Sequence, residues 1–293
     1  MESKVILTRN PNILTPGGRV NKQVTVQAIH KGLIVLTGKN SASLAWRSLF
    51  SPNDVVGIKV NGLSGQMMST HPDLVNAIVE GLRLADVPDE KIIIWDRTSS
   101  DLTRAGFIIN VRGSGVKCFG TEVVGYDEEP EIQESIGSCF SRILSTHCTA
   151  LINVPVLKDH DLAGVTLSLK NFYGAIHNPN KYHDNNCDPY IADLNTHPFI
   201  KDKLRLVVCD GIEAQYNGGP SYKPRWRWNF SGLIMSFDPV AADSVGANII
   251  ETKRKENGLP SLEEAKRPPK HIATAAKKGL GMDDLTKIKV LEL

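Results

Sequence analysis

Five short runs of mostly apolar residues recur along the chain, and they constrain its fold more than any other feature. Each run is four to six residues long: Val55–Val60, Ile92–Trp95, Ala150–Val154, Leu204–Val208 and Leu233–Phe237. Near-continuous apolarity, rather than strict alternation with polar residues, is typical of strands that are buried on both faces. Because helix-like segments separate several of the runs, the chain predicts an α/β fold: a mostly parallel sheet with helices on both faces.

Two segments beside these runs have the signals of helix starts. After the first run, apolar residues recur every four positions, at Leu74, Ile78 and Leu82. This spacing predicts an amphipathic helix, with Thr70 or His71 as its N-cap and Pro72 in its first turn. Asp238 followed by Pro239 predicts the N-cap of a second helix.

The length and the distribution of these signals favour one large domain. We expect a single α/β domain over residues 1–293, with its core in residues 50–250. Residues 177–231 have little periodicity and are rich in Asn, Pro, Gly and aromatic residues, which favours a loop-rich insert or lid. Residues 251–293 are expected to form a helical or extended C-terminal segment.

Charge and hydropathy exclude several classes of partner. Lys and Arg number 34 against 32 Asp and Glu, and the net charge of +2 does not favour nucleic acid. No apolar run approaches the roughly 20 residues that cross a bilayer, so we expect no membrane insertion. The start, MESKVILTRNP, has no leader pattern, which favours the cytoplasm; export to the periplasm is the alternative if a twin-arginine leader precedes the chain. The oligomeric state is left open.

The cysteines predict neither disulfides nor a cluster. There are five, an odd number, and no C-x-x-C occurs among them. The sequence therefore offers neither a disulfide framework nor an iron-sulfur motif.

Polar residues follow the predicted strands at their carboxyl ends. They are Lys59 and Asn61, Asp96 and Arg97, Lys158 and His160, Asp210, and Asp238. In open parallel sheets the ligand crevice lies beyond these ends, so we expect the polar side chains to meet in one cleft. For Asp238, a purely structural role as helix N-cap is the alternative.

Four of these residues are candidate catalytic groups: His160, Lys158, Asp96 and Asp210. His160 could exchange a proton with a substrate, helped by Asp96 or Asp210, because a histidine beside a carboxylate titrates near neutral pH. Lys158 would be the base instead if burial lowers its pKa. The alternatives are a surface pair of Asp96 with Arg97 and a buried ion pair of Asp210 with Lys158.

A second group of residues is expected to hold an anion. Residues Gly164–Ser168 are small and rich in hydroxyl groups, and their backbone N–H groups could bind one. The predicted substrate-binding residues are Lys59, Asn61, Arg97, Lys170 and Asn171. With this many cations, the expected ligand is a small carboxylate or phosphate.

The histidines raise the question of a metal. Five of the eight lie between positions 147 and 197. The spacing of His177, His183 and Cys187 matches no standard zinc motif. A divalent metal at His160 and His177 is therefore a candidate beside ordinary packing histidines.

Several stretches resemble the domain-of-unknown-function 362 family. They are DVVGIKVNGLSGQMMSTHPDLVNAIVEGLRLADVP, IIIWDR, LINVPVLKDHDLAGVTLSLKNFYG and DPVAAD. The resemblance covers most of residues 50–250, and its most specific part is Asn153–Gly174. It implies a fold more than a reaction. Some relatives carry ferredoxin-like cysteine motifs, which this chain lacks, so the resemblance implies no cluster here.

A fainter similarity is to lactate racemase and its nickel-pincer relatives. It would place Asp96 and Arg97 near a substrate, and Lys158 and His160 near a metal or a tethered cofactor. Likeness of fold alone does not establish an activity.

Two functions follow from these observations. The first is an enzyme that acts by acid-base chemistry on a small anionic compound, hydroxy- or keto-acid-like, with or without a metal. The second is a protein that holds a metal ion or an anionic metabolite without converting it. Which acid and which reaction stay open.

Overall fold

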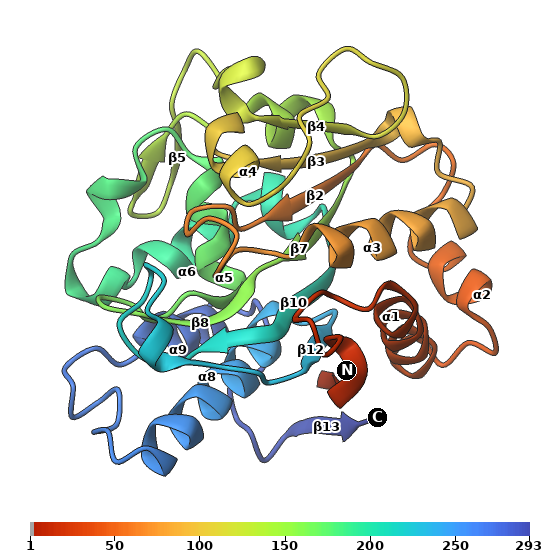
Figure 1. Ribbon diagram of the computed structural model, residues 1–293. Helices are drawn as coiled ribbons and strands as arrows, with labels where there is room; N and C mark the ends of the chain where they lie inside the picture. The colour runs from red at the N-terminus through yellow and green to blue at the C-terminus, as the bar shows by residue number, and fades with distance from the viewer. Residues whose placement is uncertain (1–2) are drawn as a thin grey trace.

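The computed structural model describes residues 3–293, and in this range it contains an eleven-stranded mixed sheet (Figure 1). This confirms the predicted α/β fold. Eight strands form the main path, in the order β13 (Ile288–Glu292), β1 (Ser3–Arg9), β12 (Gly232–Ser236), β10 (Leu204–Gln215), β7 (Ala150–Val154), β2 (Val56–Val60), β3 (Ile92–Asp96) and β4 (Lys117–Gly120). Three further strands lie off this path. Two of them pair with β10, namely β8 (Val156–His160) and β11 (Arg227–Trp228), and β9 (Gly164–Val165) pairs with β8. A separate hairpin pairs β5 (Glu131–Gln133) with β6 (Ile136–Ser138).

The strand directions divide the sheet in two. β10, β7, β2, β3 and β4 are mutually parallel, as expected. β12 is antiparallel to both of its neighbours, β10 and β1. Because β12 runs the other way, its carboxyl end and the following Asp238 lie at the edge opposite to the ends of β2 and β3. The expectation that Asp238 shares their cleft is therefore wrong, and Asp238 instead caps a helix by accepting from the N–H of Ala241.

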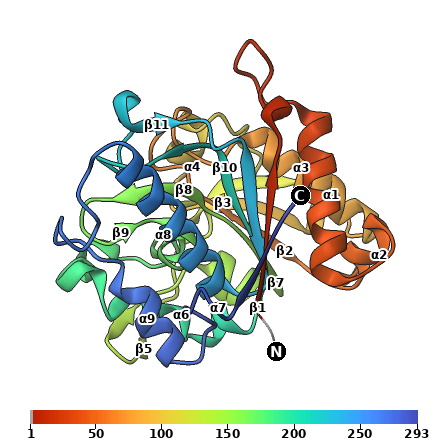
Figure 2. The same cartoon turned by 90° about the horizontal axis from the view of Figure 1, so that it is seen from below.

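Helices cover both faces of the sheet, as Figure 2 shows. One face carries α1 (Lys22–Thr37), α2 (Ala42–Arg47) and α3 (Pro72–Leu84). The other carries α8 (Pro239–Glu256) and α9 (Lys270–Lys277), with α5 (Leu167–Asn171), α6 (Tyr190–Asn195) and α7 (Pro198–Lys201) beside them. α4 (Ser99–Arg104) follows β3. The predicted helix after Thr70 is confirmed as α3, with His71 as its N-cap and Pro72 in its first turn.

Short helical turns fill the connections. They are η1 (Pro11–Ile13), η2 (Asp89–Lys91), η3 (Thr121–Val123), the π-helical turn η4 (Ile143–His147), η5 (Phe172–Ala175), η6 (Pro179–Tyr182), η7 (Asn185–Cys187) and η8 (Pro224–Trp226). Residues 177–231 therefore contain turns, two short helices and the long strand β10. In the described part of the chain, no helix combines the length and the apolarity needed to span a membrane.

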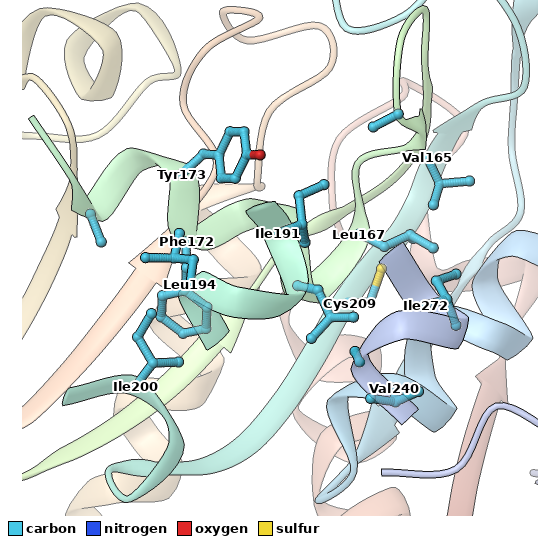
Figure 3. Close-up of a cluster of buried hydrophobic side chains, with 14 of the residues drawn as sticks. Val165, Leu167, Phe172, Tyr173, Ile191, Leu194, Ile200, Cys209, Val240 and Ile272 are labelled. Atoms are coloured by element: carbon cyan, nitrogen blue, oxygen red, sulfur yellow. The ribbon is translucent and has the colours of Figure 1, made fainter. Parts of the chain in front are cut away.

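Alternating side chains of each strand divide the core into two clusters. On β7, Leu151 packs with the cluster under α8, whereas Ile152 packs with the cluster under α1 and α3. Figure 3 shows part of the first cluster, where Leu167, Cys209 and Val240 meet. Every residue of β2, β3 and β7 is buried, which explains why these strands are apolar except at Lys59, Asp96 and Asn153.

Two strands extend beyond the rim of the sheet and position the site. β7 ends opposite the end of β2, and after Pro155 the chain continues as β8. β8 runs beside the second half of β10, which reaches Gln215 and so exceeds the predicted run. Lys158 and His160 therefore lie above the edge at which β2 and β3 end.

Candidate functional site

A cavity of about 330 Å³ lies above the carboxyl ends of β2 and β3. Its size is at the lower end of the range for small-molecule sites. Eight of the ten predicted site residues line it: Lys59, Asn61, Asp96, Arg97, Lys158, His160, Lys170 and Asn171. Polar residues that follow different strands of the sheet, far apart in the sequence, therefore meet in one cavity, as expected.

Asp210 and His177 are not among the residues that line this cavity. Oδ2 of Asp210 accepts a hydrogen bond from the backbone N–H of His71 and lies 2.8 Å from Nδ1 of the same residue. This corrects two expectations, because Asp210 neither assists His160 nor pairs with Lys158. The ring of His177 packs edge-on against Tyr126, with the ring centroids 5.1 Å apart.

Lys59 and Asp96 form a buried ion pair at the floor of the cavity. Nζ of Lys59 lies 2.6 Å from Oδ1 of Asp96 and also donates to the carbonyl of Val60. The carboxylate accepts two backbone N–H groups as well, from Gly62 and Arg97. Asp96 therefore pairs with Lys59 rather than with the guanidinium of Arg97, and its oxygens are already engaged.

Lys158 is fully buried, and no carboxylate of residues 3–293 lies within hydrogen-bonding distance of it. Its Nζ donates to Oδ1 of Asn61 at 2.9 Å, to Oγ of Ser64 at 2.9 Å and to the carbonyl of Met68 at 3.1 Å. The hydroxyl of Ser64 donates its own hydrogen to Pro220. All three partners thus act as acceptors, which is the set of bonds that an ammonium group makes. Burial lowers the pKa of Lys158 to about 7.

A chain of buried amides runs away from Lys158. Asn61 donates to Oδ1 of Asn171 at 3.1 Å, and Asn171 donates to Oδ1 of Asn153 at 2.7 Å. Asn153 in turn donates to the carbonyl and the hydroxyl of Ser168. Asn61 and Asn171 also line the cavity, so their predicted role in substrate binding stays a prediction. The hydrogen bond between them positions Oδ1 of Asn61 as an acceptor for Lys158. Asn153 was missed because it stands inside an apolar strand.

The hydrogen bonds of His160 set its tautomer. Its Nδ1 accepts from the backbone N–H groups of Leu162 and Ala163, at 3.1 and 3.2 Å. The proton of a neutral imidazole must then be on Nε2. Burial, reinforced by the charge of Lys170, lowers the pKa of His160 to about 2. In this state His160 has an N–H at Nε2 that can donate a hydrogen bond, and it is a poor base.

His183 holds the opposite tautomer. Its Nδ1 lies 3.1 Å from the carbonyl of Pro179, which can only accept, so the lone pair is on Nε2. Nζ of Lys170 lies 3.2 Å from that Nε2, and the rings of His160 and His183 are 5.9 Å apart. Burial lowers the pKa of Lys170 to about 8. His183 was not predicted as a site residue, because its segment has no periodicity that would place it.

The backbone stretch expected to bind an anion already donates within the protein at Thr166 and Ser168. Ser168 and Leu169, at the start of α5, donate to the two carboxylate oxygens of Asp243 at 2.7 and 2.9 Å. Asp243 is buried on α8, so it anchors the short helix that carries Lys170. An external anion would therefore meet the side chain of Lys170 rather than this stretch of backbone.

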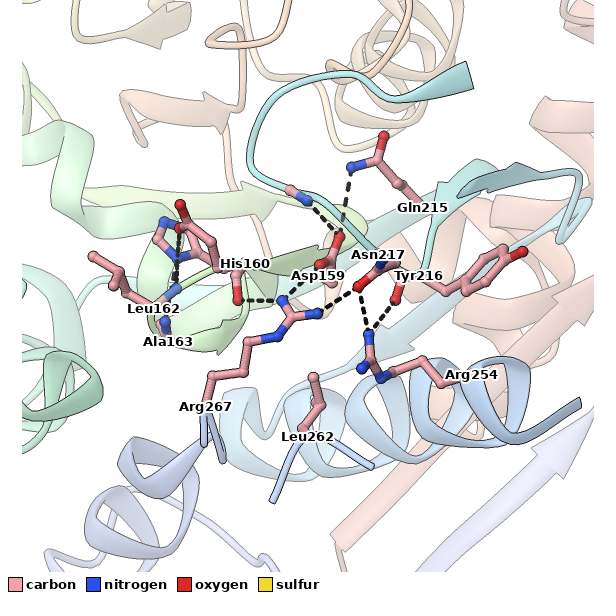
Figure 4. A network of polar contacts seen from close by, with 12 residues as sticks. Asp159, His160, Leu162, Ala163, Gln215, Tyr216, Asn217, Arg254, Leu262 and Arg267 are labelled. Atoms are coloured by element: carbon pink, nitrogen blue, oxygen red, sulfur yellow. Dashed lines mark hydrogen bonds and ion pairs between the residues drawn. The ribbon is translucent and has the colours of Figure 1, made fainter. Parts of the chain in front are cut away.

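The C-terminal segment holds β8 in place through a polar network (Figure 4). Arg267 donates to Oδ2 of Asp159 at 2.7 Å and to the carbonyl of His160 at 2.8 Å. It also donates to Asn217, which accepts from Arg254 as well. The strand that carries Lys158 and His160 is thus fixed from its outer side.

The described residues that line the cavity do not form an evident set of metal ligands. No group of three or more His, Cys, Asp or Glu suited to a metal occurs among residues 3–293. A histidine ligand needs a free lone pair on the nitrogen that faces the metal, whereas Nε2 of His160 carries its proton. His177, the other candidate, does not line the cavity.

Comparison with known proteins identifies the family. Residues 56–248 match the family model described as domain of unknown function (DUF362), which is more than half of the chain. The chain belongs to this family. No curated protein matches it, and the similarity to lactate racemase is not confirmed.

Proposed function

We propose that this member of the DUF362 family is an enzyme that binds a small organic anion, hydroxy- or keto-acid-like, and moves a proton on it. The observation that carries the proposal is a pair of buried lysines, Lys158 and Lys170, that line one cavity and have no hydrogen-bonded carboxylate. Buried cations without a counter-charge are costly. An anionic ligand supplies the missing charge.

The free hydrogen-bonding groups of the cavity support an anion rather than a neutral compound. All three hydrogens of the protonated Lys158 bond within the protein, so this residue contributes positive charge to the cavity but no hydrogen bond to a ligand. Lys170 uses one hydrogen for His183 and can direct the others to a ligand. His160 adds the N–H of Nε2. A bound carboxylate therefore meets donors from Lys170 and His160.

The two histidines supply the proton donor and the proton acceptor. His160 presents an N–H that can hydrogen-bond the developing negative charge on a substrate oxygen. His183 presents a lone pair on Nε2, which a ligand frees when it draws Lys170 away. Removal of a proton next to a carbonyl or carboxylate group needs both functions at once.

Proton exchange tests this proposal without knowledge of the natural substrate. The wild-type protein is incubated in D₂O with a panel of 2-hydroxy and 2-keto acids, and loss of each C–H signal is followed by NMR. We expect exchange on at least one acid, and His183→Gln should lower its rate about 100-fold or more while binding stays within about threefold. The exposed His147→Gln is the matched control and should leave the rate unchanged.

The second candidate is a protein that holds an anion without converting it. It is favoured by the fixed bonding of Lys158, which makes a positive cavity even without a reaction. Binding of an acid with no exchange on any member of the panel would overturn the catalytic proposal and support this one. Absence of binding by any acid would overturn both.

A further inference from the structure

Arg97 is a fourth cation of the cavity, beside Lys59, Lys158 and Lys170, and its hydrogen-bond partners are uncharged. Its guanidinium donates to the carbonyl of His177 at 3.3 Å and contacts the hydroxyl of Tyr126. Its backbone N–H, rather than its side chain, bonds Asp96. Among the described residues, Arg97 forms no ion pair with a carboxylate. Its remaining N–H groups are available to a ligand.

Arg97 and Lys170 are held by opposite ends of one wall of the cavity. The wall is the segment 177–183: Arg97 bonds the carbonyl of His177 at its start, and Lys170 bonds the ring of His183 at its end. Between them lies η6 (Pro179–Tyr182), whose Pro179 lines the cavity. Both cations line the cavity, and they bond different residues of this segment. A ligand can therefore meet them as two separate donor groups.

The carboxylates of the cavity do not neutralise these two cations. Asp96 is paired with Lys59. Asp101 is paired with Arg104, an arginine that does not line the cavity. Asp161 is exposed and lies beside Nδ1 of His160, and its charge raises the pKa of Lys170 by less than burial lowers it. Neither Arg97 nor Lys170 is therefore paired with a carboxylate of the cavity.

We propose that the ligand is a small dianion that carries one carboxylate at Lys170 and a second anionic group at Arg97. This inference rests on the proposed function and narrows its substrate class to dicarboxylic acids. Arginine binds carboxylates through two parallel hydrogen bonds, which fixes the orientation of the ligand. A volume of about 330 Å³ excludes large acids.

Matched pairs of acids test this assignment by calorimetry. Each pair has the same carbon skeleton around the hydroxyl group, as in 2-hydroxypropanoate and 2-hydroxybutanedioate. We expect the wild-type protein to bind the dicarboxylate about tenfold to a hundredfold more tightly than the monocarboxylate, since a charge-assisted hydrogen bond has about this effect. Arg97→Gln should remove most of the difference, because it should weaken binding of the dicarboxylate far more than binding of the monocarboxylate.

Further variants separate charge from folding. Lys170→Met should weaken the binding of both acids. Arg97→Lys, unlike Arg97→Gln, should keep part of the preference for the dicarboxylate. The matched control is Arg47→Gln. Arg47 is exposed, pairs with Asp86 and does not line the cavity. Circular dichroism establishes that each variant is folded.

The outcomes distinguish the two proposals. Equal affinity of the wild-type protein for both members of each pair overturns the dianion assignment and leaves the proposed function intact. Retention of the preference in Arg97→Gln overturns the role of Arg97. Absence of binding by every acid overturns the proposed function itself.

Discussion

Nδ1 of His71 lies 2.8 Å from Oδ2 of Asp210, and the backbone N–H of His71 donates to the same oxygen. The pair joins the N-terminus of α3 to the middle of β10. It therefore closes the loop of residues 61–70, which carries Ser64 and Met68, two of the acceptors of Lys158. Asp210 thus contributes to the site by fixing a loop rather than by facing the cavity.

The charge of His71 predicts a pH-dependent stability. Burial opposes the protonated imidazole, but the carboxylates of Asp210 and Glu213 outweigh burial and raise the pKa of His71 to about 10. Because the folded-state pKa is the higher one, the stabilisation is complete below about pH 6.5 and is lost as the pH rises towards 10. We expect His71→Gln to lower the free energy of unfolding by about 2 to 4 kcal/mol at pH 6, and by much less at pH 10.

Urea denaturation between pH 6 and 10 measures this difference. The lowered pKa values of Lys158 and Lys170 produce the opposite trend, since burial of their charged forms is relieved as the pH rises. The quantity to compare is therefore the free energy of unfolding of the wild type minus that of the variant, because the contributions of the two lysines cancel in this difference. A difference that stays constant with pH would contradict the assignment.

The positions of Asp210 and Asp238 show where strand-end reasoning from sequence fails. The rule placed Lys59, Asp96 and Lys158 correctly, because β2, β3 and β7 are parallel and end at one edge. β10 continues to Gln215, so Asp210 stands in mid-strand, and β12 is antiparallel, so Asp238 lies at the other edge. Neither strand length nor strand direction can be derived from an apolar run alone.

Other parts of the site depend on tertiary contacts that leave no local signal. The tautomers of His160 and His183 are set by backbone groups, which any residue type would provide. Arg267 lies in a segment predicted only as helical or extended, yet it fixes β8 through Asp159. The sequence could therefore indicate which residues meet, but not which of them carry protons.

A change at Asn61 should remove the electrostatic basis of anion binding. Asn61→Asp places a carboxylate at the atom that Lys158 now bonds as a neutral acceptor. The pKa of Lys158 should rise from about 7, because an adjacent negative charge favours the ammonium form. We expect the affinity for 2-hydroxypropanoate to fall about tenfold at pH 6, since the cavity then contains its own counter-charge.

Calorimetric titrations from pH 6 to 9 check this prediction. In the wild-type protein, affinity should fall with rising pH as Lys158 and Lys170 lose their protons. The variant should bind weakly over the whole range and depend less on pH. Unchanged affinity at pH 6 would show that Lys158 does not attract the anion.

Arg267 and Asp159 form an ion pair, so the effects of substituting them on the free energy of unfolding should be strongly coupled. Arg267→Met leaves the fully buried carboxylate of Asp159 without its partner, and we expect a loss of about 3 to 5 kcal/mol in unfolding free energy. Asp159→Asn added to this variant should recover part of the loss. Urea denaturation of the double-mutant cycle gives the coupling energy.

An exposed pair is the control for this cycle. Lys253→Met removes a surface contact with Glu256 and should cost less than about 1 kcal/mol. If the double variant lost as much unfolding free energy as the sum of the two single variants, this would contradict a direct interaction between Arg267 and Asp159.

Gly174 should tolerate no side chain, because it lies against the ion pair at the floor of the cavity. A Cβ at this position would stand 2.8 Å from Oδ1 of Asp96 and 3.0 Å from Nζ of Lys59. Both groups are buried, so the pair must separate or the backbone of η5 must shift. We expect Gly174→Ala to lower the free energy of unfolding by about 1 to 3 kcal/mol and to weaken anion binding. Gly137→Ala is the matched control, because no atom lies within 4 Å of its Cβ, and it should stay within about 0.5 kcal/mol of wild type. Equal urea midpoints for the two variants would mean that the residues at the floor of the cavity can shift to make room for a methyl group. Close packing would then not fix the Lys59–Asp96 pair.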